Sequence, residues 1–83
     1  MNTLEGLGVG EEAVVARVTG DGKLRKRILD MGITKGCRIR KVKVAPLGDP
    51  IEVALRGYEL SIRKEDAASV EIEPAEAEPA GEA

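Results

Sequence analysis

Two runs of alternating apolar and polar residues constrain the fold of this chain more than any other feature. Ile51–Leu55 and Tyr58–Ile62 alternate with a period of two on either side of Arg56-Gly57, a pattern typical of a β-hairpin. A two-residue turn would place six apolar side chains on one face of the hairpin: Ile51, Val53, Leu55, Tyr58, Leu60 and Ile62. Because Arg56 would then need a positive φ, which arginine disfavours, we expect a looser turn.

Three further strands are predicted to extend this hairpin into a larger sheet, and one helical turn precedes the last of them. Ala13–Thr19 is rich in β-branched and apolar residues, which favours a strand buried mostly on both sides. Cys37–Val44 predicts a second strand, but its alternation slips by one residue, so we expect a bulge or sharp bend near Arg40-Lys41. Lys64–Ala68 resembles one helical turn, and Ser69–Ile72 predicts a short final strand.

One segment changes from the strand period to the helix period. Within Lys23–Met31, the apolar residues fall at i, i+4 and i+7, which places them on one helix face: Leu24, Ile28 and Met31. Asp21 can cap the start of this helix, and Gly32 can adopt the left-handed conformation after its end. We therefore expect one short helix between the first two long strands.

These elements predict a mainly β fold, a small SH3-like five-stranded barrel with one short helix. The core should be aliphatic, because Tyr58 is the single aromatic residue among 83. Residues 1–73 are expected to form the barrel. Residues 74–83 lack large apolar side chains and are expected to form an acidic, disordered tail.

Charge and cysteine content restrict the binding partners and the cellular compartment that we expect for the chain. Four acidic residues and no basic one lie between Glu73 and Ala83, which leaves residues 1–72 with 13 basic and 11 acidic side chains. This imbalance is too small to indicate polyanion binding. Cys37 is the single cysteine, and the longest uninterrupted apolar stretch is Ala13–Ala16. We therefore expect a cytoplasmic chain that does not insert into a membrane.

The chain offers no arrangement of residues that catalysis would need. There is no histidine, so the lone thiol of Cys37 has no base beside it. Gly6–Gly10 is glycine-rich but precedes a strand, whereas a phosphate-binding loop follows a strand and opens a helix. Asp49 and Glu52 have no histidine or cysteine nearby and would make a poor Fe²⁺ site. We expect a non-enzymatic protein with no cofactor and no bound metal.

Three motifs in order resemble the ferrous iron transport protein A (FeoA) family. Arg27–Gly36 is similar to the helix and loop of that family, Pro46–Ile51 to its P-x-G-D-P loop, and Val53–Arg63 to its hairpin. The resemblance covers residues 4–72. It departs from the family pattern at Ile28, where leucine is usual, and in the acidic tail.

The resemblance implies an SH3-like fold and an accessory role in ferrous iron uptake. The implied partner is the cytoplasmic part of the FeoB-type membrane iron transporter, which carries a GTPase domain. We expect the contact to involve the outer face of the helix, the following glycine-bounded loop and the proline-flanked loop: Lys23, Lys26, Arg27, Gly32, Gly36 and Asp49.

Four alternatives remain open from sequence alone. One is a metal-responsive regulator fragment, which would need a bound metal or a DNA-binding half, and the sequence offers neither. Basic residues at 23–27 and 38–43 would suit a small nucleic-acid-binding barrel, although the near absence of aromatic residues and the net charge of −2 oppose that function. Arg27 could be supplied to a GTPase in trans, but an ordinary ion pair with Asp30 or another carboxylate is the simpler interpretation. Exposed barrel edges and outer-face residues such as Ala54 would also permit a homo-oligomer.

Overall fold

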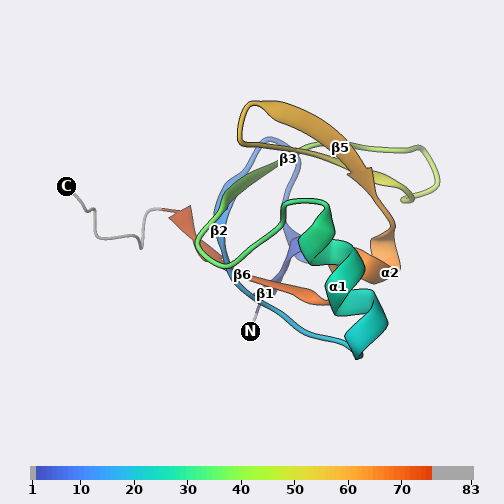
Figure 1. The fold of residues 1–83 in the computed structure, drawn as a ribbon. Coiled ribbons are helices and arrows are strands. Elements are labelled where there is room, and N and C mark those ends of the chain that lie inside the picture. The colour runs from blue at the N-terminus through green and yellow to red at the C-terminus, as the bar shows by residue number, and fades with distance from the viewer. Residues whose placement is uncertain (1, 76–83) are drawn as a thin grey trace.

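The computed structural model describes residues 2–75 and shows a curved antiparallel sheet with helices at one side (Figure 1). Six strands follow the order β1-β6-β2-β3-β4-β5, so the mainly β prediction is confirmed, whereas the predicted number of five strands is wrong because the N-terminal segment adds β1. The strands are β1 (Asn2–Thr3), β2 (Glu12–Val18), β3 (Arg38–Val44), β4 (Ile51–Leu55), β5 (Tyr58–Ile62) and β6 (Val70–Pro74). The helices are η1 (Leu4–Gly6), α1 (Gly22–Asp30) and α2 (Lys64–Ala67). The expected acidic tail was predicted to begin one residue too early, because Pro74 is the last residue of β6 and pairs with Ala13. Residues 76–83 of that tail lie outside the described part of the chain.

The β4–β5 hairpin has the predicted register, but its turn is tighter than expected. Leu55 pairs with Tyr58, and the pairing continues without a shift to Ile51 and Ile62. The expectation of a looser turn is wrong, because Arg56 has φ 50° and Gly57 has φ 85°. Two positive φ angles match the right-handed twist of a hairpin. The strained arginine is held in place by a hydrogen bond that its guanidinium donates to Thr34 Oγ1 at 2.8 Å.

The expected bulge in the second long strand lies one residue beyond the predicted place. The β3–β4 register shifts between Lys41 and Lys43, so Val42 is the extra residue. Before the bulge, Lys41 pairs with the buried Val53 and shares its inward face. After the bulge, Lys43 faces outward opposite Glu52. The bulge therefore leaves one lysine inside the barrel.

Helix α1 begins and ends within one residue of the predicted limits, Lys23 and Met31. The Asp21 side chain accepts a hydrogen bond from the Leu24 N–H at 2.9 Å, which caps the helix. Ile28 is fully buried, and Leu24 and Met31 are half-buried against the core. Gly32 has φ 95°, the left-handed conformation expected after the helix end.

The N-terminal segment contributes two elements that the sequence analysis did not identify. The two-residue strand β1 pairs with β6, with Asn2 opposite Ile72. It leads into η1, whose Leu4 is fully buried. The core is aliphatic as predicted. Its largest fully buried side chains come from η1, α1, the loop after α1 and strands β2 to β6: Leu4, Val15, Ile28, Ile33, Ile39, Ile51, Val53, Ile62 and Val70.

Candidate functional site

The exposed face of α1 carries the basic residues that were predicted to contact a partner. Lys23 and Lys26 are exposed, as is Arg25, which was not among the predicted contact residues. The Lys26 ammonium lies 3.1 Å from Asp30 Oδ2, one turn along the helix, and both side chains are largely in water. Such a pair contributes only about 0.3–0.5 kcal/mol, so a partner could replace it at little cost.

Arg27 is bound by a carboxylate from another element. One guanidinium nitrogen, Nη2, lies 3.1 Å from both carboxylate oxygens of Asp66 on α2. Asp66 is 4% exposed, whereas the Arg27 side chain remains 54% exposed. The interpretation that Arg27 pairs with a nearby carboxylate is thus confirmed, with Asp66 rather than Asp30 as its partner. A buried carboxylate that depends on this guanidinium holds α1 against α2.

A shallow depression between α1 and α2 brings two of the predicted site residues together. Its volume is about 300 Å³, and Lys23 and Arg27 line it from α1. The remaining lining residues are Asp21, Leu24, Glu65 and Asp66. Lys26 does not line this depression, because it lies on the side of α1 that faces Asp30. The surface mixes both signs of charge, which suits recognition of a protein rather than of a uniformly charged polymer.

The two predicted glycines of the loop after α1 shape the backbone beside this helix. At Gly32, an added Cβ would lie 2.5 Å from the Tyr58 hydroxyl oxygen. That hydroxyl donates a hydrogen bond to the Met31 carbonyl at 2.7 Å. Gly36 has φ 87°, and its N–H donates to the Val15 carbonyl at 2.8 Å. The loop is therefore fixed at both ends and can present a defined surface.

Asp49, the last of the predicted contact residues, lies in a different place. Its Oδ1 accepts a hydrogen bond from the Lys64 N–H at 2.9 Å, at the start of α2. It lines a separate depression with Glu5, Arg63, Lys64, Glu65 and Ala68. Asp49 thus satisfies a backbone donor at a helix start, and the structure does not bring it to the depression that Lys23 and Arg27 line.

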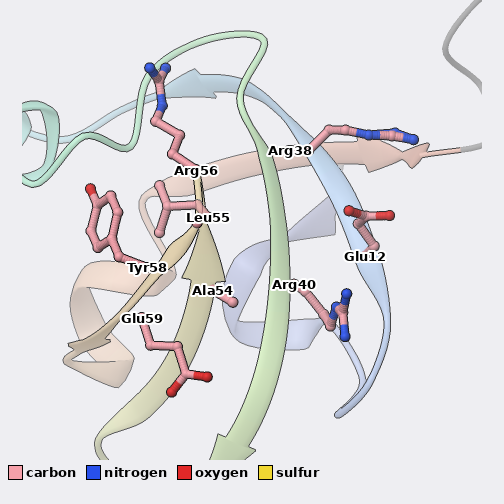
Figure 2. Close-up of a pocket in the computed structure, with 9 residues that line it drawn as sticks. Glu12, Arg38, Arg40, Ala54, Leu55, Arg56, Tyr58 and Glu59 are labelled. Atoms are coloured by element: carbon pink, nitrogen blue, oxygen red, sulfur yellow. The ribbon is translucent and has the colours of Figure 1, made fainter.

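A further depression, which the sequence analysis did not identify, lies on the outer face of β3, β4 and β5 (Figure 2). Its volume is about 350 Å³. Ala54 forms its floor between Arg40 on β3 and Glu59 on β5, which are its direct cross-strand neighbours. Glu12, Arg38, Leu55, Arg56, Gly57 and Tyr58 complete the lining. The sequence does indicate this depression in one way: the alternation of the hairpin places the small side chain of Ala54 on the outer face.

The inward-facing Lys41 weakens the case for a nucleic-acid-binding surface on β3. Its side chain is almost fully buried, and its ammonium donates to the Glu5 carbonyl at 2.9 Å. Burial lowers the pKa of Lys41, and the nearby carboxylates of Glu5 and Glu11 oppose that effect. One of the basic residues expected to contact phosphates is therefore inside the protein. Arg40 lies opposite Glu12 on β2, which reduces the local positive charge further.

Within residues 2–75, two features that would indicate metal binding or membrane insertion are absent. This part of the chain contains no group of three or more Cys, Asp or Glu side chains placed to hold a metal ion. It also contains no helix with the length and apolar character required to cross a bilayer.

The fold defined by these elements is an SH3-like β-barrel. The crystal structure of Stenotrophomonas maltophilia FeoA complexed with zinc, described as a procaryotic SH3 domain protein, superposes with a TM-score of 0.76. It is 26% identical, and the match covers 88% of this chain and 91% of that one. The NMR structure of a FeoA-like protein from Clostridium acetobutylicum gives a TM-score of 0.81 at 36% identity, over 89% of this chain and 90% of that one.

The sequence comparisons assign the family. The FeoA domain model matches residues 2–74. A Porphyromonas gingivalis protein named Fe(2+) transport protein A/Fe(2+) transporter FeoB fusion protein is 47% identical over 70 residues. That match covers 84% of this chain and 8% of the fusion protein, so the chain spans a small part of this relative's length. The chain belongs to the FeoA domain family, as its motifs indicated.

Proposed function

We propose that this chain is a cytoplasmic, non-enzymatic accessory protein of ferrous iron uptake. It binds the cytoplasmic part of a FeoB-type transporter and modulates that transporter through protein contacts. The observation that carries the proposal is the 47% identity to a protein whose name joins Fe(2+) transport protein A and the transporter FeoB in one fusion. A domain that is covalently joined to a transporter in one organism is a good candidate for a non-covalent partner in another.

The exposed face of α1 and the loop that follows it are the surface that we assign to this contact. Lys23 and Lys26 are available because neither is held by a buried partner. Hydrogen bonds at Met31 and Gly36 hold the two ends of the loop, so little conformational entropy is lost when a partner binds it. The two basic side chains would steer an acidic surface of the partner toward this face.

Arg27 has a positioning role in this proposal. Its guanidinium would have to leave the nearly buried Asp66 carboxylate before it could reach into a GTPase site. That movement would leave a buried charge without its partner, which costs about 2–3 kcal/mol. We therefore assign Arg27 to holding α1 on α2, with its exposed edge at the rim of the contact.

The test is an amide NMR titration of the ¹⁵N-labelled full chain with the soluble GTPase domain of its FeoB partner. We expect chemical shift changes that cluster on residues 23–36. Shift changes confined to the outer face of β3–β5 would move the contact to the depression of Figure 2. An unchanged spectrum at saturating concentration would overturn direct binding to that domain.

A further inference from the structure

The outer side of β5 is an open sheet edge. Within residues 2–75, β5 and β1 are the two outermost strands of the sheet. The edge strand β1 has two residues, whereas β5 has five. An edge strand presents a row of N–H and C=O groups that can pair with another strand.

The register of the hairpin identifies which backbone groups face this edge. Leu55 and Tyr58 flank a two-residue turn and therefore exchange hydrogen bonds with each other. Leu60 and Ile62 lie two and four residues after Tyr58, so their backbone N–H and C=O groups also point toward β4. The N–H and C=O groups of Glu59 and Ser61 must then point away from β4, toward the open edge.

This edge lacks three of the features that commonly protect such strands. Its sequence, Tyr-Glu-Leu-Ser-Ile, contains no proline and no lysine, and its pairing with β4 has no bulge. Glu59 and Ser61 are exposed, and Leu60 is half-buried. β5 can therefore accept a strand over most of its length.

We propose that two copies of this chain associate through antiparallel pairing of their β5 strands, centred on Ser61. In a two-fold pairing, residues of equal parity lie opposite each other and share a face. Centring the axis on Ser61 places Glu59 opposite Arg63 of the second copy, and the symmetry repeats this pair. Centring it on Glu59 would oppose like charges, and centring it on Leu60 would pair Glu59 with the uncharged Ser61.

The structure around β5 favours the same register. Arg63 continues the extended backbone with φ −66° and ψ 145°, and its side chain is 68% exposed. Its present contact with Glu65 is 3.7 Å long and lies in water, so exchanging it for Glu59 costs little. The Tyr58 end of β5 is flanked by the loop after α1, because the Tyr58 hydroxyl binds the Met31 carbonyl. A ladder that spans 59–63 avoids that end.

The experiment is sedimentation equilibrium of the full chain up to about 1 mM, since a contact made by one strand pair falls at the weak end of specific interfaces. We expect a dimer with a dissociation constant on the order of 0.1 mM. Glu59→Arg or Arg63→Glu alone should weaken it about tenfold, because each creates two like-charge contacts. The double variant Glu59→Arg/Arg63→Glu should restore it, because the pairs are then reversed but complementary.

Two controls separate this mechanism from effects of net charge or folding. Glu73→Arg makes the same charge change on an exposed residue of β6, which is four strands away from β5 in the sheet order, and it should leave the dimer unchanged. Ser61→Pro removes an N–H that β4 does not use, and it should abolish the dimer while far-UV circular dichroism stays the same. A chain that stays monomeric at 1 mM, or a double variant that fails to recover the dimer, overturns the proposal. If the chain is monomeric, the open edge of β5 would instead be available to pair with an extended segment of another protein.

Discussion

Replacing Gly32 with alanine should destabilise the domain for two separable reasons. The residue has φ 95°, a conformation that costs an L-residue about 1–2 kcal/mol. The new Cβ would also lie 2.5 Å from the Tyr58 hydroxyl oxygen, which must move away. Moving it breaks the 2.7 Å hydrogen bond to the Met31 carbonyl, worth about 0.5–1.5 kcal/mol. The total is roughly 1.5–3.5 kcal/mol, or a fall of about 10–20 °C in Tm for a domain of this size.

The second contribution can be isolated with a double variant. Tyr58→Phe removes the hydroxyl, so Gly32→Ala in that background should lose only the backbone contribution. The double variant should then be more stable than the sum of the single variants predicts by about 0.5–1.5 kcal/mol. Gly36→Ala is the matched control: Gly36 also has a positive φ, but no atom lies within 4 Å of an added Cβ.

Urea unfolding followed by circular dichroism measures all of these free energies. The reasoning predicts coupling between positions 32 and 58 and none between positions 36 and 58. Strict additivity at 32 and 58, or an equal coupling at 36, would refute the packing argument. A cost below about 0.5 kcal/mol for Gly32→Ala would refute the backbone argument as well.

Two other predictions concern buried charge. Arg27→Ala should destabilise the domain by about 2–3 kcal/mol and Asp66→Ala by about 1 kcal/mol, because only the first leaves a buried charge without a partner; equal losses in urea unfolding would contradict this. Burial lowers the pKa of Lys41 below its ordinary value of 10.5, although Glu5 and Glu11 counteract this. Between the lowered and the ordinary pKa the unfolded chain binds more protons, so stability should rise with pH in that window, relative to Lys41→Met. A free-energy difference between the two proteins that stays constant from neutral pH to about 10.5 would show that burial does not act on this lysine.

Most of the fold could be predicted from sequence patterns that involve residues close together in the chain. The alternation of Ile51–Leu55 and Tyr58–Ile62 sets the hairpin register, and the capping aspartate and following glycine set the limits of α1. These features depend on residues close in sequence, where periodicity and backbone preference act directly. The tight turn at Arg56 was missed because arginine's local preference yields to the twist of a fully paired hairpin.

The features that the sequence did not predict depend on contacts between residues that are far apart in the chain. Strand β1 forms because Asn2 meets Ile72, and Asp66 is recognised as important only when Arg27 lies against it. Lys41 continues the inward phase of Cys37 and Ile39, but its burial requires the Glu5 carbonyl as an acceptor. No local pattern identifies such partners. The same limit applies to the proposed contact surface, whose members the structure separates into the α1 face and the isolated Asp49.

The most direct test of the central proposal is the affinity of the full chain for the soluble GTPase domain of FeoB, measured by isothermal titration calorimetry. Lys23→Glu changes an exposed residue on α1, and the acidic side chain suits the first turn of the helix, so folding is not impaired. Lys43→Glu makes the same charge change on the exposed outer face of β3. We predict that Lys23→Glu weakens binding about tenfold and that Lys43→Glu changes it less than about twofold. Equal effects of the two variants, or no binding by the unmodified chain, would contradict the proposal that this FeoA-family chain binds the GTPase domain of FeoB through α1.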